Sequence, residues 1–190
     1  MRKYFLFFLI AAGLFGDDPR GWISLKPSYF YPQDNLFRHL YGDGFLCSAE
    51  LGYMLGNRCF FTLESGYFHK AETLASFDLK FSSSVTVVPS SLYLGSIIAQ
   101  GNFWDLYVKA GPNIVYARTH VEIPNLPTNV RKWYVGGSFG CGSKFYFYKG
   151  FFLDLFFNYL YDRKKIKASG DRFFVYVGGF QTGGAIGYRF

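Results

Sequence analysis

The feature that most constrains the fold is a two-residue alternation that runs back from the last residue of the chain. One parity carries mostly apolar or aromatic side chains: Phe190, Tyr188, Ile186, Gly184, Thr182, Phe180, Gly178, Tyr176 and Phe174. The other parity carries small or polar ones: Arg189, Gly187, Ala185, Gly183, Gln181 and Gly179. Because successive side chains of a strand point to opposite faces, the pattern predicts a C-terminal strand with one apolar face.

The same alternation recurs along most of the chain and predicts further strands before the closing one. We expect them at residues 21–31, 45–55, 59–67, 77–98, 104–116, 133–147 and 153–161. Short turns alternate with longer loops, which are expected at Pro32–Gly44, Lys70–Ser76, Thr119–Val130 and Asp162–Asp171. The spacing predicts eight antiparallel strands in up-and-down order and no helix of consequence.

The segment 77–98 changes its apolar phase part-way along. Residues Phe77, Leu79 and Phe81 alternate on one parity, whereas Leu92 and Leu94 alternate on the other. A β-bulge adds one residue to a strand and so shifts its phase. We therefore expect a bulge near Ser82–Ser84.

Two short turns set the register of the strands that they join. Three-residue turns at Gly56–Arg58 and at Tyr148–Gly150 keep the apolar sets of each hairpin on one face. This register puts Glu50 opposite Glu64 and Lys144 opposite Asp154, all on the less apolar face.

Two carboxylates so close repel each other unless cations approach from other strands. Lys26, Lys109 and Arg189 share the phase of the two glutamates. We expect these three residues, together with Glu50, Glu64, Lys144 and Asp154, to form a charge network that closes the interior. A water-filled lumen with separately solvated charges is the alternative.

Composition indicates which face of the sheet is outside. Aromatic residues make up 23% of the chain, with 24 Phe and 16 Tyr, and charged residues only 17%. A secreted soluble barrel would turn its apolar face inward. The less apolar face here is rich in Gly and Ser and poor in charge, which suits a crowded interior. We therefore expect an all-β, eight-stranded antiparallel up-and-down transmembrane β-barrel.

The N-terminus predicts export. Met1-Arg2-Lys3 precedes an apolar run, Tyr4–Phe15, that is too short for a spanning helix and has the length of a secretory signal. We expect a signal peptide at 1–16, cleaved after Gly16, and a single barrel domain at 17–190. Cleavage after Gly13 or a retained helical anchor are the alternatives. Loss of Arg2 and Lys3 lowers the formal charge from +7 to +5.

Metal, cofactor and nucleic-acid sites are not expected. The three cysteines, Cys47, Cys59 and Cys141, have no ligand spacing and fall on the apolar phase, where we expect them to be free. No glycine-rich phosphate loop precedes a helix, and no basic stripe of the kind that binds nucleic acid is present.

Several segments carry a family resemblance. Tyr107–Tyr116, Trp133–Gly142, Gly150–Leu155 and the closing Gly187–Phe190 resemble strands of small outer-membrane β-barrel proteins of the OmpA-like, OmpX-like and opacity-protein group. The resemblance implies an outer-membrane location in a Gram-negative-type bacterium and contacts with membrane lipid and lipopolysaccharide. It also implies that Phe190, Tyr188 and Ile186 are the signal read by the barrel-assembly machinery.

The resemblance is specific for architecture and leaves the activity open, since one fold hosts many functions. We expect a monomer with a structural or surface-interaction, adhesin-like role. A narrow pore or a hydrophobic-ligand carrier is the alternative, and a lipid A-modifying enzyme is a third. The basic segment Arg163, Lys164, Lys165 and Lys167 is a candidate contact for lipopolysaccharide phosphates or an acidic surface ligand.

An enzyme of this fold would need a serine beside a histidine that an acid orients. The histidines are His39, His69 and His120, the acids near them are Glu72 and Glu122, and the hydroxyls are Ser76, Ser82 and Ser83. None forms a His-x-Ser arrangement. We therefore expect no catalytic residues.

Overall fold

A computed structural model describes residues 20–76, 79–122, 128–168 and 171–190. The expected signal peptide lies outside these residues. The strands are β1 (Gly21–Pro32), β2 (Gly44–Met54), β3 (Cys59–Ser76), β4 (Leu79–Gln100), β5 (Trp104–Glu122), β6 (Thr128–Tyr148), β7 (Phe151–Ala168), β8 (Asp171–Tyr176) and β9 (Gly179–Arg189). One helix, α2 (Asn35–Tyr41), lies between β1 and β2.

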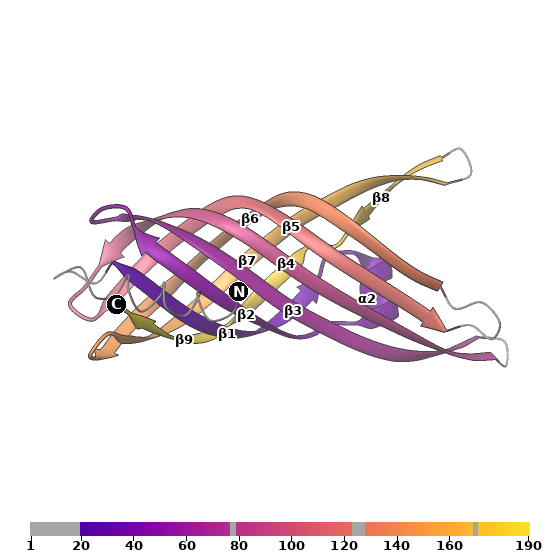
Figure 1. Ribbon diagram of the computed structural model, residues 1–190, viewed down its shortest axis with the longest axis horizontal. Coiled ribbons are helices and arrows are strands. Elements are labelled where there is room, and N and C mark those ends of the chain that lie inside the picture. Colours follow the sequence, from indigo (N-terminus) through magenta and orange to yellow (C-terminus); the bar gives the residue numbers. More distant parts are fainter. Residues whose placement is uncertain (1–19, 77–78, 123–127, 169–170) are drawn as a thin grey trace, which may run out of the picture.

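The strands close into an antiparallel up-and-down barrel (Figure 1). Each strand from β1 to β7 pairs with its neighbour in the chain, and β9 pairs with both β7 and β1. β8 and β9 keep one register along β7 and together form the eighth strand, interrupted at Val177–Gly178. The predicted eight-stranded barrel is confirmed.

The two ends of the barrel differ. We call one of them the turn end, because the short turns lie there. The two ends of the described chain also meet there, where Gly21 and Phe190 exchange two backbone hydrogen bonds of 2.8 Å. The helix and the long hairpins β3–β4, β5–β6 and β7–β8 lie at the opposite, loop end (Figure 1).

Three connections predicted as loops are largely strand. β3 continues through Lys70–Ser76, β5 and β6 leave only 123–127 between them, and β7 and β8 pair from Arg163↔Tyr176 to Ala168↔Asp171. The prediction failed because apolar alternation marks only the band of a barrel that must be apolar. Strands that extend beyond this band keep their backbone pairing without the pattern.

The connection Pro32–Gly44 contains a short helix where only a loop was expected. Asp34 caps it, because its carboxylate accepts a hydrogen bond of 2.9 Å from the backbone N–H of Phe37. Gly42, with a φ of 68°, ends it. Among the described residues, no helix is both long and apolar enough to cross a membrane.

The bulge expected near Ser82–Ser84 is absent. β3 and β4 keep one register from Cys59↔Ser96 to Ser76↔Leu79, and the irregularity in β4 lies between Ile97 and Ala99, opposite β5. The apolar pattern changes instead because the interior itself becomes apolar toward the loop end, where the inward side chains include Val85 and Val87.

The turn between β6 and β7 is also tighter than predicted. Lys149 and Gly150 form a two-residue turn with φ values of 38° and 88°, and a register shift falls between Tyr146 and Tyr148. Because Phe147 takes up the shift, Lys144 still pairs with Asp154 as expected.

The faces are those of an inside-out protein. Large apolar side chains point outward around the whole barrel, with Leu25 58% exposed and Leu94 64% exposed. The inward positions instead carry buried charged and polar residues such as Lys26 and Glu50. A water-soluble barrel would have the reverse arrangement.

Candidate functional site: the lumen

Inward side chains from all eight barrel strands fill the lumen in three layers. An apolar layer lies at each end of the barrel, and a layer of charged and polar side chains lies between them. The layers follow from the register, since inward residues at the same height on neighbouring strands face one another.

The loop-end layer is the larger apolar one. Its members are Phe30, Leu46, Phe68, Val85, Val87, Val115, Ala117, Tyr134, Leu160 and Val177. The rings of Phe30 and Phe68 meet edge to face with centroids 5.6 Å apart. Phe37 of α2 packs against this layer. The helix is therefore held against the loop-end layer through Phe37.

The turn-end layer is aromatic. It contains Trp22, Phe60, Ile97, Tyr107 and Phe152, with Met54 and Tyr146 packed against it. Glycines make room for its rings: a Cβ at Gly52 would collide with Trp22, one at Gly95 with Phe60, and one at Gly187 with Phe152. Inward glycine and aromatic residues on neighbouring strands thus complement each other in shape.

Four charged side chains meet between the two apolar layers. The Lys26 ammonium lies 3.0 Å from Glu50 Oε2 and 3.2 Å from Glu64 Oε2. The Lys109 ammonium lies 2.7 Å and 2.8 Å from the same two oxygens. These four residues form the charge cluster. Glu50 and Glu64 are directly opposed on β2 and β3, and lysines from β1 and β5 neutralise them.

Neutral partners complete the hydrogen bonding of the two glutamates. Trp22 Nε1 donates to Glu50 Oε1 at 2.9 Å, and Ser48 Oγ donates to Glu64 Oε1 at 3.1 Å. Both lysines also lie over rings, Lys26 4.1 Å from the centroid of Phe156 and Lys109 4.2 Å from that of Tyr93. A buried charge is tolerated only with such pairing.

Lys144 and Asp154 are adjacent in register, yet they do not form the ion pair that we expected. Among the described residues, no carboxylate lies within 4.0 Å of the Lys144 ammonium, which lies 3.6 Å from the ring centroid of Trp22. Asp154 instead accepts a hydrogen bond of 2.9 Å from the Tyr107 hydroxyl and lies 4.0 Å from Lys26. The long lysine stem carries its charge into the turn-end layer, beyond the reach of the short aspartate.

Arg189 lies apart from the charge cluster as well. Its guanidinium carbon is 5.9 Å from the ring centroid of Tyr146, at the turn end. The seven expected network residues therefore divide into two groups. The structure brings five together around Lys26 and places Lys144 and Arg189 toward the turn end.

Sequence reasoning missed the neutral partners in the lumen. Asn113 Nδ2 donates to Asp162 Oδ2 at 2.6 Å, and Gln181 Nε2 donates to the Ser28 hydroxyl at 3.0 Å. The Tyr146 hydroxyl donates to Asp105 at 2.7 Å. All of these residues fall on the inward parity of their strands, and this parity could have identified them as lumen residues. The first two pairs join strands that do not follow each other in the chain, the third joins the consecutive strands β5 and β6, and alternation alone reveals none of them.

The catalytic candidates do not come together. His39 is exposed on α2, and His69 and His120 stand on the outward parity of β3 and β5. Ser83 points into the lumen and is buried, and Ser82 is exposed on the outward face. The side chains of Glu72, Glu122 and Ser76 lie outside the described part of the chain. Within that part, no three His, Cys, Asp or Glu residues could hold a metal ion.

The remaining candidates lie on the outer surface or at the ends. Cys47, Cys59 and Cys141 are free. Ile186 and Tyr188 point outward from β9, and the Phe190 backbone pairs with Gly21. The basic segment Arg163–Lys167 forms part of β7 in the β7–β8 hairpin, and its side chains are not among those described.

Comparison with solved structures decides the architecture. The N-terminal barrel domain of Pseudomonas aeruginosa OprF matches with a TM-score of 0.59 and 18% identity over 91% of this chain and 98% of that chain. The chain has the fold of the small outer-membrane β-barrels. Neisserial surface protein A matches with a TM-score of 0.62 and 13% identity, covering 90% of this chain and 97% of that one.

A major outer-membrane protein of Thermus thermophilus gives a TM-score of 0.64 at 12% identity, over 90% of this chain and 99% of that chain. No family model and no curated protein matches the sequence. At identities this low the likeness establishes the fold and leaves the activity to the residues of this chain.

Proposed function

We propose that the protein is an integral outer-membrane barrel that works as a closed scaffold and presents its loop-end hairpins for contacts at the cell surface. The filled lumen is the observation that carries this proposal. Two apolar layers enclose a charge cluster in which Lys26 is 0% exposed and Glu50 2% exposed. A wide water-filled path through such an interior would require the layers to separate, so we favour a scaffold over a pore.

The outward apolar surface supports a membrane location. In water, this apolar surface would cost about 25 cal/mol of free energy for every Å² left exposed, whereas lipid acyl chains cover the surface without that cost. Closure of β9 onto β1 removes both open edges, as a strand in lipid requires. We place the turn end in the periplasm and the loop end outside, and we retain the proposal that residues 1–16 are a cleaved export signal and that Phe190, Tyr188 and Ile186 direct assembly.

The ligand class that we propose is a polyanion, such as lipopolysaccharide phosphate or an acidic surface polymer. β7 and β8 extend beyond the barrel wall, because β1 pairs with β9 only as far as Pro32↔Gly179 (Figure 1). The hairpin therefore carries the sequence positions Arg163, Lys164, Lys165 and Lys167 on a narrow two-stranded ribbon at the loop end. The role is non-catalytic in this proposal.

Retention of intact cells on immobilised heparin tests this function. Cells that express the protein should be retained at low salt and released as salt rises, because the contact is electrostatic. The double variant Lys164→Gln/Lys165→Gln should lose retention. Arg131→Gln/Lys132→Gln, which removes the same charge from the neighbouring hairpin, should keep it. Equal retention of both variants, or none for the parent, would contradict the proposal.

A further inference from the structure

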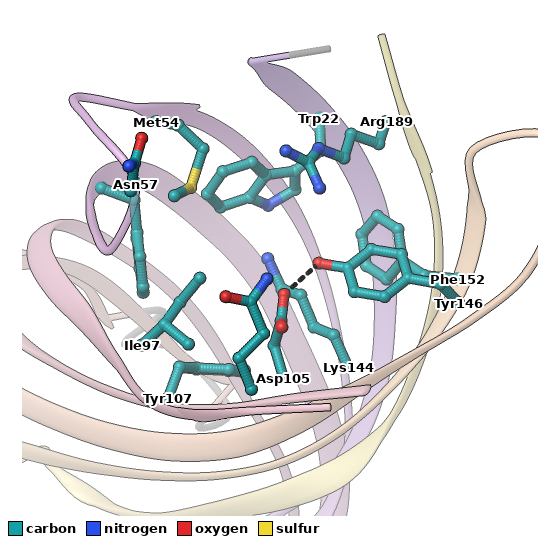
Figure 2. A pocket seen from close by; sticks show the side chains of 12 residues that line it. Trp22, Met54, Asn57, Ile97, Asp105, Tyr107, Lys144, Tyr146, Phe152 and Arg189 are labelled. Carbon is teal, nitrogen blue, oxygen red and sulfur yellow. Dashed lines mark hydrogen bonds between the residues drawn. The ribbon is translucent and has the colours of Figure 1, made fainter. Parts of the chain in front are cut away.

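A second site lies at the turn end of the lumen, separate from the hairpins. A cavity of about 40 Å³ opens there, and Figure 2 shows the side chains that surround it. Its lining combines the turn-end layer with polar groups from the rim: Trp22, Met54, Asn57, Phe60, Ile97, Gln100, Asp105, Tyr107, Lys144, Tyr146, Phe152 and Arg189. Asn57 and Gln100 are exposed, so the turn-end cavity reaches the surface.

Lys144 is the unusual group in this cavity. Its side chain points into the cavity from β6 (Figure 2) and is only 6% exposed. An ammonium has three donors to satisfy. Within the described part of the chain, Lys144 makes neither a hydrogen bond nor an ion pair. Its ammonium instead faces four rings, those of Trp22, Phe152, Tyr107 and Phe60, at 3.6, 5.1, 5.4 and 5.7 Å from their centroids.

Ring faces stabilise a cation but do not accept its hydrogen bonds as an anion does. The buried ammonium is therefore incompletely compensated within the chain. This contrasts with Lys26 and Lys109, each of which contacts two carboxylate oxygens.

The other charges around the cavity favour an anion too. Arg189 adds a second cation from the closing strand, and Asp105 adds one carboxylate whose Oδ2 accepts a hydrogen bond from the Tyr146 hydroxyl. Two cations and one carboxylate give the lining a net charge of +1. The amides of Asn57 and Gln100 are further donors at the rim.

We propose that the turn-end cavity binds a compact monovalent anion, a halide or a short carboxylate, between Lys144 and Arg189. The size of the cavity sets this class: about 10–15 Å³ is needed for one water molecule, so a 40 Å³ cavity holds a few waters or one small anion. Apolar walls from Met54 and Ile97 would accommodate the methyl group of a carboxylate such as acetate.

Tryptophan fluorescence can test the site, because Trp22 forms one wall of the cavity. Trp104→Phe/Trp133→Phe removes the other two tryptophans, and iodide serves as both quencher and anionic probe. Sulfate holds the ionic strength constant. Quenching of Trp22 in the folded, detergent-solubilised protein should saturate with iodide concentration, and chloride or acetate should relieve it. The stronger competitor identifies the halide or the carboxylate as the better ligand.

Variants separate the site from general electrostatics. Lys144→Met should abolish the saturable quenching, and Arg189→Gln should weaken iodide binding about tenfold, the loss of one charge-assisted contact. Lys149→Gln, which removes a cation outside the cavity, should bind as the parent does. Neutral acrylamide should quench all four proteins alike. The proposal would be overturned if quenching rose linearly with iodide concentration or if neither chloride nor acetate relieved it. It would also be overturned if Arg189→Gln and Lys144→Met were both quenched as the parent is.

Discussion

At the scale of single residues, the charge cluster is the feature on which the interior most depends. Glu50 lies within hydrogen-bonding distance of Lys26, Lys109 and Trp22, and these contacts tie β2 to β1 through Lys26 and Trp22 and to β5 through Lys109. Glu64 shares both lysines. Loss of either carboxylate would leave two buried lysines facing a single opposed charge, with Asp154 4.0 Å from one of them.

Replacement of Glu50 by Gln should therefore destabilise the barrel by about 3–5 kcal/mol, the cost of breaking a buried ion pair from one side. Urea unfolding in detergent, followed by the heat-modifiable band, measures the change. The double variant Glu50→Gln/Lys109→Met restores one lysine to one glutamate and should recover a large part of the loss. Asp43→Asn removes a carboxylate outside the lumen and serves as the control, and it should unfold at nearly the same urea concentration as the parent. Equal stability of Glu50→Gln and parent would mean that water already solvates these charges.

The sequence predicted this cluster in part. The two-residue alternation identified which side chains point inward, and the turn lengths predicted which residues stand opposite each other. Glu50 and Glu64 are paired as this register predicts. It did not predict that Lys144 turns away from Asp154 toward Trp22. The position of the Lys144 ammonium depends on the length of its side chain and on rings from four other strands, and neither is visible in a local sequence pattern.

At the scale of elements, the turn between β6 and β7 sets the register that carries Lys144 and Asp154. Lys149 and Gly150 both have positive φ, as a two-residue hairpin turn requires. Asn-Gly is the sequence that most often occupies such a turn. A Cβ at Gly150 would lie 2.6 Å from the carbonyl oxygen of Arg189.

Gly150→Ala should accordingly lower the free energy of unfolding by at least about 1–2 kcal/mol, from the left-handed backbone alone. Lys149→Asn at the adjacent position should be neutral or stabilising, because asparagine tolerates positive φ. The two variants are compared by the same urea titration. A Gly150→Ala protein as stable as the parent would show that the turn adopts another conformation.

Element boundaries were the least predictable part of the fold. The alternation of apolar residues ends where the outer surface no longer needs to be apolar, so the sequence pattern predicts loops where β3, β5 and β7 extend toward the loop end. The phase change in β4 had a similar origin. It reflects an apolar interior around Val85 and Val87, and the strand itself is continuous there.

At the scale of the whole molecule, the architecture was predictable because a barrel repeats one rule eight times. Alternation, turn spacing and an apolar C-terminal strand all indicated the same closed sheet, and errors at individual boundaries did not alter the strand number. The functional properties follow from what fills that sheet. A barrel of eight strands has an interior that side chains can just fill, and here apolar layers at both ends enclose the charge cluster.

Planar-bilayer recording of the purified protein tests this sealed lumen most directly. With insertion verified by flotation of the same preparation in liposomes, the closed barrel predicts a membrane with no stepwise conductance in 1 M salt. A porin inserted under the same conditions provides the positive control. Regular, long-lived current steps from the parent protein would contradict the sealed lumen and would support the narrow pore in its place.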